Sequence, residues 1–113
     1  MHDNLINYVE FKAKDLEAIK QFYSAAFGWQ FTDYGPDYVA FNESGIEGGF
    51  RQWNEEIVNG ALVILYHSNL EEIKETVIAN GGIIIEDIFS FPGGRRFHFT
   101  DPAGNELAIW SDK

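Results

Sequence analysis

The sequence predicts an α+β fold of two βαβββ modules that form a curved mixed sheet, with a concave cup on one face and the helices outside. Three observations predict it: segments that alternate polar and apolar residues, two segments of helical periodicity that begin at a capping residue, and a repeat of the pattern 54 residues along the chain. We therefore expect a single domain over residues 1–113, with modules at about 1–53 and 61–113.

The first module opens with a predicted strand over 5–13, where Glu10 and Lys12 alternate with apolar residues. Asp15 is then a good N-cap, and Gly28 is a good helix end. The apolar stripe of this helix is Leu16, Ile19, Phe22, Tyr23 and Ala26. Three strands follow over 29–34, 38–41 and 46–53, separated by turns at 35–37 and 42–45.

The second module repeats this order after a polar linker over 54–60. A strand over 61–66 leads to Asn69, which caps a helix that ends at Gly81-Gly82. The apolar face of this helix is predicted to be Leu70, Ile73, Val77 and Ile78. Strands over 83–88, 95–100 and 105–110 complete the module, with turns at 91–94 and 101–104.

The repeat is visible in the residues themselves. A shift of 54 places Asp15 on Asn69, and it superimposes six identical residues of the two helices, which in the first helix are Leu16, Glu17, Ile19, Lys20, Ala25 and Gly28. A slightly larger shift places the turn at 42–45 on the turn at 101–104, and Glu47 on Glu106. A four-stranded sheet with one helix has a thin core and open edges, so we expect the two modules to complete one another.

Charge and composition limit the possible partners. The net charge is −10, from 18 acidic and 8 basic residues, which disfavours nucleic acid and anionic membranes and favours a cationic ligand. The alternative is that the acids only keep the protein in solution. No cysteine is present, so disulfides and thiolate sites are excluded. The polar N-terminus does not resemble a signal peptide, and we expect a cytoplasmic protein.

The pattern resembles the vicinal oxygen chelate superfamily, which includes glyoxalases, extradiol dioxygenases, fosfomycin-resistance enzymes and bleomycin-binding proteins. The segments that carry the resemblance are 8–11, 15–16, 22–23, 27–29, 79–82 and the closing run Phe-His-Phe-Thr-Asp-Pro-Ala-Gly-Asn-Glu-Leu at 97–107. The resemblance covers nearly the whole chain. It implies the two-module fold, a small-molecule site in the cup and a homodimer. The tryptophans Trp29, Trp53 and Trp110, taken as exposed, are compatible with a dimer interface.

The resemblance also implies where a divalent metal would bind. Metal-dependent relatives use His and Glu from the first and last strands of each module, and these positions fall on Tyr8, Gly49, Leu62 and Ala108. Leu, Gly and Ala offer no ligand atom, and a tyrosinate alone does not hold such an ion. We therefore expect no metal and no other cofactor. A two-residue shift would bring in Glu47 and Glu106, so a divalent metal stays open.

The predicted ligand-binding residues are those that strand alternation places in the cup. They are Tyr8, Glu10, Lys12, Gly49, Arg51, Leu62, Tyr66, His98, Ala108 and Trp110. If Phe97 and Phe99 face the helices, His98 faces the cup, and it is the best acid/base candidate, with Glu10 second. For any one of these residues, simple packing or ion pairing is the competing interpretation.

Three functions remain open at this point. The leading hypothesis is a metal-free protein of the glyoxalase/bleomycin-resistance type that binds a small molecule, and its specific form is sequestration of a cationic or aromatic compound. The alternative is an enzyme: a glyoxalase-like lyase or isomerase with a metal at Glu47 or Glu106, or a metal-free acid/base catalyst at His98 or Glu10. A third is an interaction module without a ligand.

Overall fold

The fold was obtained as a computed structural model, which describes residues 2–113. Met1, the first residue of the polar N-terminus, lies outside the described residues. The chain divides into two compact units, one ending at Glu55 and the other running from Glu56 to Lys113. We call them unit 1 and unit 2. Each contains one helix and one four-stranded sheet, which confirms the α+β class and the two βαβββ modules.

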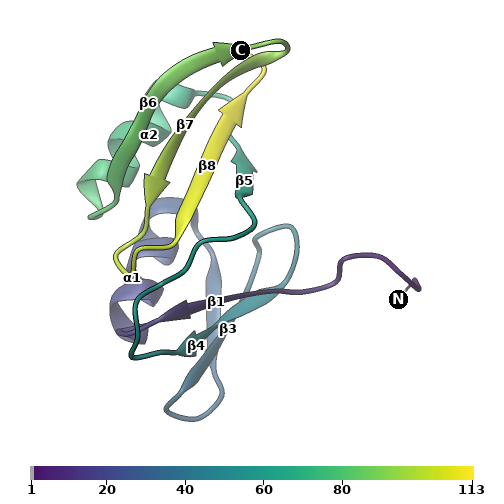
Figure 1. Ribbon diagram of the computed structural model, residues 1–113, viewed down its shortest axis with the longest axis vertical. Coiled ribbons are helices and arrows are strands. Elements are labelled where there is room, and N and C mark those ends of the chain that lie inside the picture. The colour runs from purple at the N-terminus through teal and green to yellow at the C-terminus, as the bar shows by residue number, and fades with distance from the viewer. Residues whose placement is uncertain (1) are drawn as a thin grey trace. The chain divides into compact units, whose positions relative to one another are not determined.

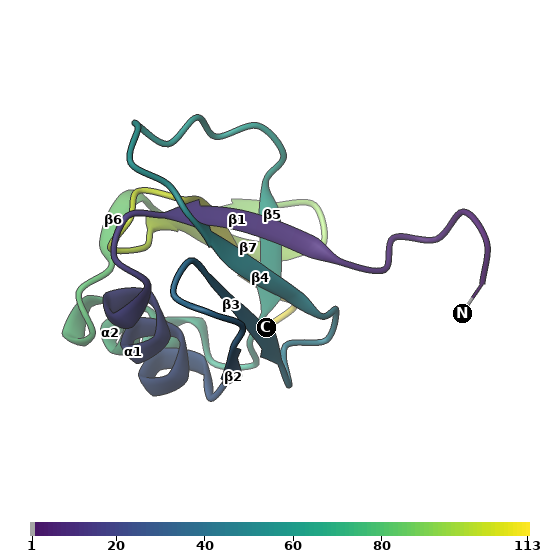
Figure 2. The same ribbon diagram turned by 90° about the horizontal axis from the view of Figure 1, so that it is seen from below.

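Unit 1 contains β1 (Val9–Ala13), α1 (Leu16–Phe27), β2 (Gln30–Asp33), β3 (Tyr38–Asn42) and β4 (Gly48–Gln52). Its strand order is β1-β4-β3-β2, with β1 parallel to β4 and the other pairs antiparallel. Helix α1 packs on one side of this sheet (Figures 1 and 2). All five residues of its predicted apolar stripe are buried.

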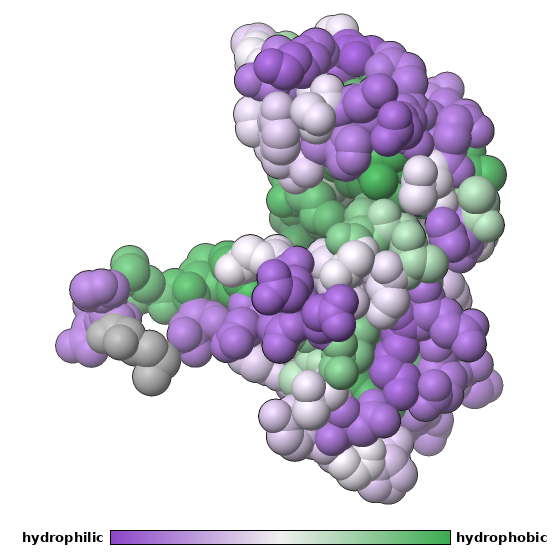
Figure 3. All heavy atoms as spheres, turned by 180° about the vertical axis from the view of Figure 1, so that it is seen from behind, coloured by the Kyte–Doolittle hydropathy of each residue, from purple (hydrophilic) through white to green (hydrophobic). Residues whose placement is uncertain are grey.

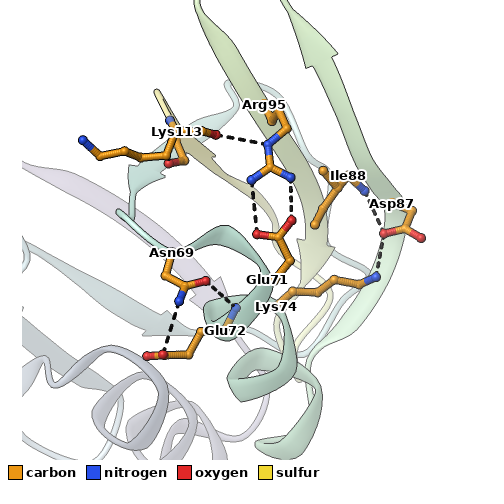
Figure 4. A network of polar contacts seen from close by, with 9 residues as sticks. Asn69, Glu71, Glu72, Lys74, Asp87, Ile88, Arg95 and Lys113 are labelled. Carbon is orange, nitrogen blue, oxygen red and sulfur yellow. Dashed lines mark hydrogen bonds and ion pairs between the residues drawn. The ribbon is translucent and has the colours of Figure 1, made fainter.

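Unit 2 contains β5 (Val63–Tyr66), α2 (Leu70–Ala79), β6 (Ile83–Phe91), β7 (Gly94–Thr100) and β8 (Glu106–Ser111). Its strand order is β5-β8-β7-β6, with β5 parallel to β8 and the other pairs antiparallel. Ion pairs join its helix to its sheet, as Figure 4 shows: Arg95 binds Glu71 through two hydrogen bonds of 2.5 and 3.1 Å, and Lys74 binds Asp87 at 2.6 Å.

The strand register confirms the internal repeat. Val9 pairs with Gly48 in unit 1, and Val63 pairs with Leu107 in unit 2, so the shifts of 54 and 59 residues hold at the level of hydrogen-bonded partners. Both helix caps form as predicted. The Asp15 carboxylate accepts from the Ala18 N–H at 3.1 Å, and the Asn69 side chain accepts from the Glu72 N–H at 3.1 Å (Figure 4).

A matched ion pair shows that the repeat extends to the surface. Lys20 of α1 binds Asp33 of β2 at 3.0 Å. In unit 2, 54 residues further along, Lys74 of α2 binds Asp87 of β6. These pairs raise the pKa of Lys20, mainly through its hydrogen bonds to Glu17 and Asp33, and lower the pKa of Asp87, mainly through its hydrogen bond to Lys74.

The turn at 101–104, which follows β7, has a clear structural role. The Asp101 carboxylate is buried, and one of its oxygens accepts from the N–H groups of Ala103, Gly104 and Asn105 at 2.9 to 3.0 Å. Gly104 has φ +103°, a conformation that glycine adopts without strain. These hydrogen bonds therefore fix the backbone conformation of the turn that leads from β7 into β8.

The predictions for the exposure of the tryptophans and of Ile78, and for the start of the first strand, are wrong. Trp29 is buried, because its ring stacks on Tyr23 and Phe41 with centroids 4.6 Å away in both cases, and Trp53 and Trp110 are half-buried. Ile78 of α2 is 45% exposed, because the buried face of that helix consists of Leu70, Ile73 and Val77 alone. The first strand begins at Val9 rather than at residue 5. The preceding segment extends away from the rest of unit 1 (Figure 1), and Leu5 and Ile6 are exposed in it. Figure 3 shows apolar atoms on this arm.

Candidate functional site

Each sheet has one face covered by its own helix and a second face that carries the predicted site residues. We call the second face the open face of its unit. In β1, Val9, Phe11 and Ala13 alternate with the exposed residues Glu10 and Lys12, so Tyr8, Glu10 and Lys12 share the open face of unit 1. The register sets Glu10 beside Gly49 and Lys12 beside Arg51. All five predicted residues of the first module therefore lie together.

A pair of tyrosines lies over Gly49. The hydroxyls of Tyr8 and Tyr38 are 2.6 Å apart and share a hydrogen bond. A Cβ atom at position 49 would lie 2.7 Å from the Tyr8 hydroxyl and even closer to that of Tyr38. Because Gly49 has no Cβ atom, the two tyrosine hydroxyls have the space in which to form their hydrogen bond.

The environment of Tyr38 keeps its hydroxyl protonated. Burial is the largest cause that raises the pKa of Tyr38, followed by hydrogen bonding to Tyr8 and to Glu10 and by the charge of Glu10. Tyr38 was not among the predicted site residues. Its strand was predicted, and alternation along that strand places Tyr38 on the same face as Ala40, so the signal was present in the sequence.

A pocket of about 350 Å³ lies next to the tyrosine pair, and we call it the tyrosine pocket. It is lined by Tyr8, Thr32, Tyr34, Tyr38, Ala40, Phe41, Asn42, Glu47 and Gly48. Three of the five tyrosines of the chain contribute to it. Its one charged lining residue among the described part of the chain is Glu47, so the pocket combines aromatic surfaces with a single carboxylate.

The opposite end of the same face is basic. The Lys12 ammonium lies 4.0 Å from the centre of the Trp53 ring, and the Arg51 guanidinium lies 5.5 Å from it. Both distances are within the range of a cation–π interaction. Lys12 and Arg51 therefore flank a tryptophan, which gives them a packing role in addition to any contact with a ligand.

The open face of unit 2 carries the remaining predicted residues. The register sets Ala108 between Ile64 of β5 and His98 of β7, and Trp110 between Tyr66 and Arg96. Leu62 precedes β5 on the same face as Ile64. As predicted, Phe97 and Phe99 are fully buried on the helix side, and His98 points the other way.

His98 forms a pair with Glu106. Its Nδ1 lies 2.9 Å from the Glu106 carboxylate, and the residue is only 7% exposed. A carboxylate accepts hydrogen bonds, so the hydrogen of the neutral ring belongs on Nδ1, and Nε2 carries a lone pair. Nε2 is buried, and within residues 2–113 it has no hydrogen-bond partner.

Two phenylalanines of β6 join this face, and the sequence did not predict them. The pairing of β6 with β7 shifts by one residue between Ile84 and Glu86, and again between Glu86 and Phe89. These irregularities set both Glu86 and Phe89 on the face of His98 and Arg96. The sequence predicted a strand over 83–88 and a turn over 91–94, so Phe89 and Phe91 lay outside it, whereas β6 continues to Phe91. Even in a longer strand, a strict period of two would not place Phe89 on the face of Glu86.

The donors present do not fit a divalent ion. Over residues 2–113, no three side chains of His, Asp or Glu come together as a metal-binding group. The expected positions Tyr8 and Gly49 are occupied by the tyrosine pair and by the space it needs. A two-residue shift would bring in Glu47 and Glu106. Glu47 lines the tyrosine pocket, and Glu106 reaches His98 but no further ligand within residues 2–113, whereas catalytic zinc sites use three protein ligands. No helix of residues 2–113 is long and apolar enough to cross a membrane.

Comparisons with known proteins agree with this architecture. A sequence profile of the Glyoxalase/Bleomycin resistance protein/Dioxygenase superfamily matches residues 5–109. No curated protein sequence matches the chain. Among solved structures, a glyoxalase/bleomycin resistance protein/dioxygenase family enzyme from Burkholderia phytofirmans PsJN superimposes with a TM-score of 0.82 at 18% identity, covering 95% of this chain and 98% of that one.

Two further solved structures show the same fold. A glyoxalase-related enzyme from Fulvimarina pelagi has a TM-score of 0.77 at 20% identity, covering 96% of this chain and 88% of the relative. TioX from Micromonospora sp. ML1 has a TM-score of 0.73 at 18% identity, covering 97% and 100% of the two chains. At these identities the likeness is one of fold, and the chemistry must be argued from the residues of this chain.

Proposed function

The chain belongs to the Glyoxalase/Bleomycin resistance protein/Dioxygenase superfamily, and from that membership we propose that it is a metal-free protein that binds a small organic molecule. The observation that carries the proposal is the tyrosine pocket, whose volume of about 350 Å³ is at the lower end of the range typical of small-molecule sites. The metal-free part is supported by the described residues 2–113, in which no three His, Asp or Glu side chains come together.

The chemistry of the tyrosine pocket favours a cationic aromatic ligand. The faces of tyrosine rings attract cations, and Glu47 supplies an opposite charge at the pocket wall. The net charge of −10 would speed the approach of a cation. Such a protein works by sequestration, in which tight binding alone is the function.

A binding experiment with 2-naphthylmethylammonium tests this proposal. The protein is first treated with a chelator, and its melting temperature is then followed as the probe concentration rises. We expect a rise that follows mass action, and a weaker response in Glu47→Gln, which removes the charge at the pocket wall. Glu43→Gln, in the neighbouring turn but outside the pocket lining, is the matched control and should respond like the wild type.

Two results would overturn the proposal. One is a purified protein that carries a stoichiometric divalent metal and loses probe binding when the metal is removed. The other is a melting temperature that no cationic aromatic probe changes.

A second candidate function, a metal-free acid/base catalyst, is favoured by the His98–Glu106 pair. A carboxylate that holds Nδ1–H leaves Nε2 free to take a proton from a substrate. Exchange of deuterium into small ketones and aldehydes, followed by NMR, separates the two functions. An enzyme would catalyse exchange that His98→Asn abolishes, whereas a binding protein would leave the exchange rate at that of buffer.

We propose that the protein is a homodimer, as its family resemblance implies, and that it is located in the cytoplasm. The exposed arm before β1 supports the dimer, because Leu5 and Ile6 are 66% and 78% exposed there. Figure 3 shows apolar atoms on this arm. Light scattering of the wild type and of Leu5→Asp/Ile6→Asp tests it. A monomeric wild type would contradict the dimer.

A further inference from the structure

The open face of unit 2 carries two buried polar atoms that lack a hydrogen-bond partner within residues 2–113: Nε of Arg96 and Nε2 of His98. The two residues are two positions apart on β7 and therefore point to the same side of the sheet. Buried polar groups are nearly always hydrogen-bonded, so two such atoms on one strand face require an explanation.

The hydrogen-bonding characters of the two atoms are complementary. The Nε of arginine always carries a hydrogen and can only donate. The Nε2 of His98 has its lone pair available when the ring is neutral, because Glu106 holds the hydrogen at Nδ1. The face therefore offers one donor and one acceptor from two neighbouring positions of the same strand face.

The surroundings of Arg96 do not satisfy its Nε–H. Its guanidinium lies 5.3 Å from the centre of the Phe89 ring and 5.7 Å from that of Phe91. Packing on the phenylalanine rings contributes a cation–π attraction, but it gives Nε–H no acceptor. Its neighbour Arg95, on the other face of β7, shows the contrast, since it is paired with Glu71 (Figure 4).

Aromatic rings continue from this point across the face. Phe89 lies 5.9 Å from the His98 ring, Phe91 lies 6.4 Å from Trp110, and Trp110 lies 5.3 Å from Tyr66. Tyr66 is half exposed, so the row of rings reaches the surface. A planar ligand would find rings to stack on and, at one end, a donor and an acceptor.

We propose that the open face of unit 2 binds a neutral aromatic amide or lactam, whose carbonyl accepts from Arg96 Nε–H and whose N–H donates to His98 Nε2. A carboxylate fits less well, because it has no hydrogen for Nε2 and would approach the carboxylates of Glu106 and Glu86. This site shares no residue with the tyrosine pocket. It rests on the proposed function only in that the protein binds small organic molecules.

Access to the two atoms runs past Phe89. Both atoms are buried, and the Phe89 ring is near both the His98 ring and the Arg96 guanidinium. Phe89 lies on β6, at the edge of the sheet and at the end of its irregular stretch. Its ring must turn aside to admit a ligand, so Phe89→Ala should bind the amide faster without losing the preference for an amide.

The test compares three probes that differ only in their polar group: 2-naphthamide, N,N-dimethyl-2-naphthamide and 2-naphthoate. We expect 2-naphthamide to bind about tenfold or more tightly than either of the others, since each leaves a buried partner unsatisfied. In nitrogen NMR, binding of 2-naphthamide should shift the Arg96 Nε–H and His98 Nε2 signals.

Arginine variants supply a matched pair. Arg96→Lys should weaken the binding of 2-naphthamide by about tenfold. Arg95→Lys, one residue along the same strand but on the helix side, should leave it unchanged. If Arg96→Lys fails to fold, the test is whether 2-naphthamide shifts the Arg96 Nε–H and His98 Nε2 signals of the wild-type protein.

The outcomes separate this inference from the proposed function. Equal affinity for the three naphthalene probes, or no change in the Arg96 and His98 signals, would overturn the inference and assign the two atoms to a bound water molecule. Binding of 2-naphthylmethylammonium in the tyrosine pocket would stand in that case. Loss of cation binding with the amide preference intact would overturn the cation proposal alone.

Discussion

The two units repeat one framework and place different chemistry on it. The register makes Glu10 equivalent to Ile64 and Gly49 equivalent to Ala108. Ala40 of unit 1 pairs with Gly49 as His98 of unit 2 pairs with Ala108, so Ala40 holds the position of His98. Framework features such as the helix caps and the helix-to-strand ion pairs are alike in both units.

The difference lies on the open faces. Unit 1 has a tyrosine pair over a glycine, beside a pocket with one carboxylate. Unit 2 has a His–Glu pair, an arginine between phenylalanine rings and a row of aromatic side chains. The comparison teaches that a repeated βαβββ unit preserves the residues that make it fold and leaves one sheet face free to diverge.

The turn that precedes the last strand of each unit gives the largest expected contrast. Asp101→Ala in unit 2 removes a buried carboxylate that accepts from three backbone N–H groups, and it should cost about 3 kcal/mol or more of unfolding free energy. Asn42→Ala, at the exposed position that the repeat aligns with Asp101, should cost less than about 0.5 kcal/mol. Urea unfolding measures both. Equal losses of unfolding free energy would contradict this contrast, because they would show that Asn42 stabilises its turn as much as Asp101 does.

The glycine of β4 next to β1 gives the second contrast. Gly48 lies where unit 2 has Leu107, and a Cβ atom at Gly48 would collide with the backbone carbonyl of Val9 and with the Phe41 ring. Gly48→Ala should therefore destabilise the protein by about 2 kcal/mol. Gly60→Ala is the control, because a Cβ atom there meets nothing within 4 Å. A neutral Gly48→Ala would mean that β1 and β4 pair less closely than described.

Alkaline pH should expose a smaller difference, at the tyrosine pair. The pKa of Tyr38 is raised in the folded protein, first by burial and then by its hydrogen bond to Tyr8. Its stabilising effect is therefore complete below the ordinary tyrosine pKa of about 10, and it is lost as the pH rises above that value. Tyr38→Phe should flatten this part of the stability curve, and Tyr34→Phe, at an exposed residue of the same pocket, is its control. Identical curves for wild type and Tyr38→Phe would contradict the assignment.

Much of the framework could be predicted because local rules decide it. Caps at Asp15 and Asn69, the helical stripe of α1 and the alternation of β1 all follow from single segments of sequence. The limits of the first strand and the exposure of Ile78 and Trp29 were missed, because they depend on what packs against each residue.

The candidate sites were predicted in part, for a physical reason. Alternation placed Tyr8, Glu10 and His98 on the correct faces, since those strands are regular. It missed Phe89 and Phe91 because the strand was predicted to end at residue 88, whereas β6 continues to Phe91 and pairs irregularly with β7. It also missed the space over Gly49, because the hydroxyls that fill it come from side chains 30 residues apart in the sequence.

The central claim, a metal-free site in the tyrosine pocket, is tested most directly by NMR titration of the chelator-treated protein with 2-naphthylmethylammonium. We predict saturable shifts at Tyr34, Tyr38 and Glu47, with no change when zinc, nickel or manganese is added afterwards. Shifts that arise only after a metal is added, or that leave these three residues untouched at saturation, would contradict it.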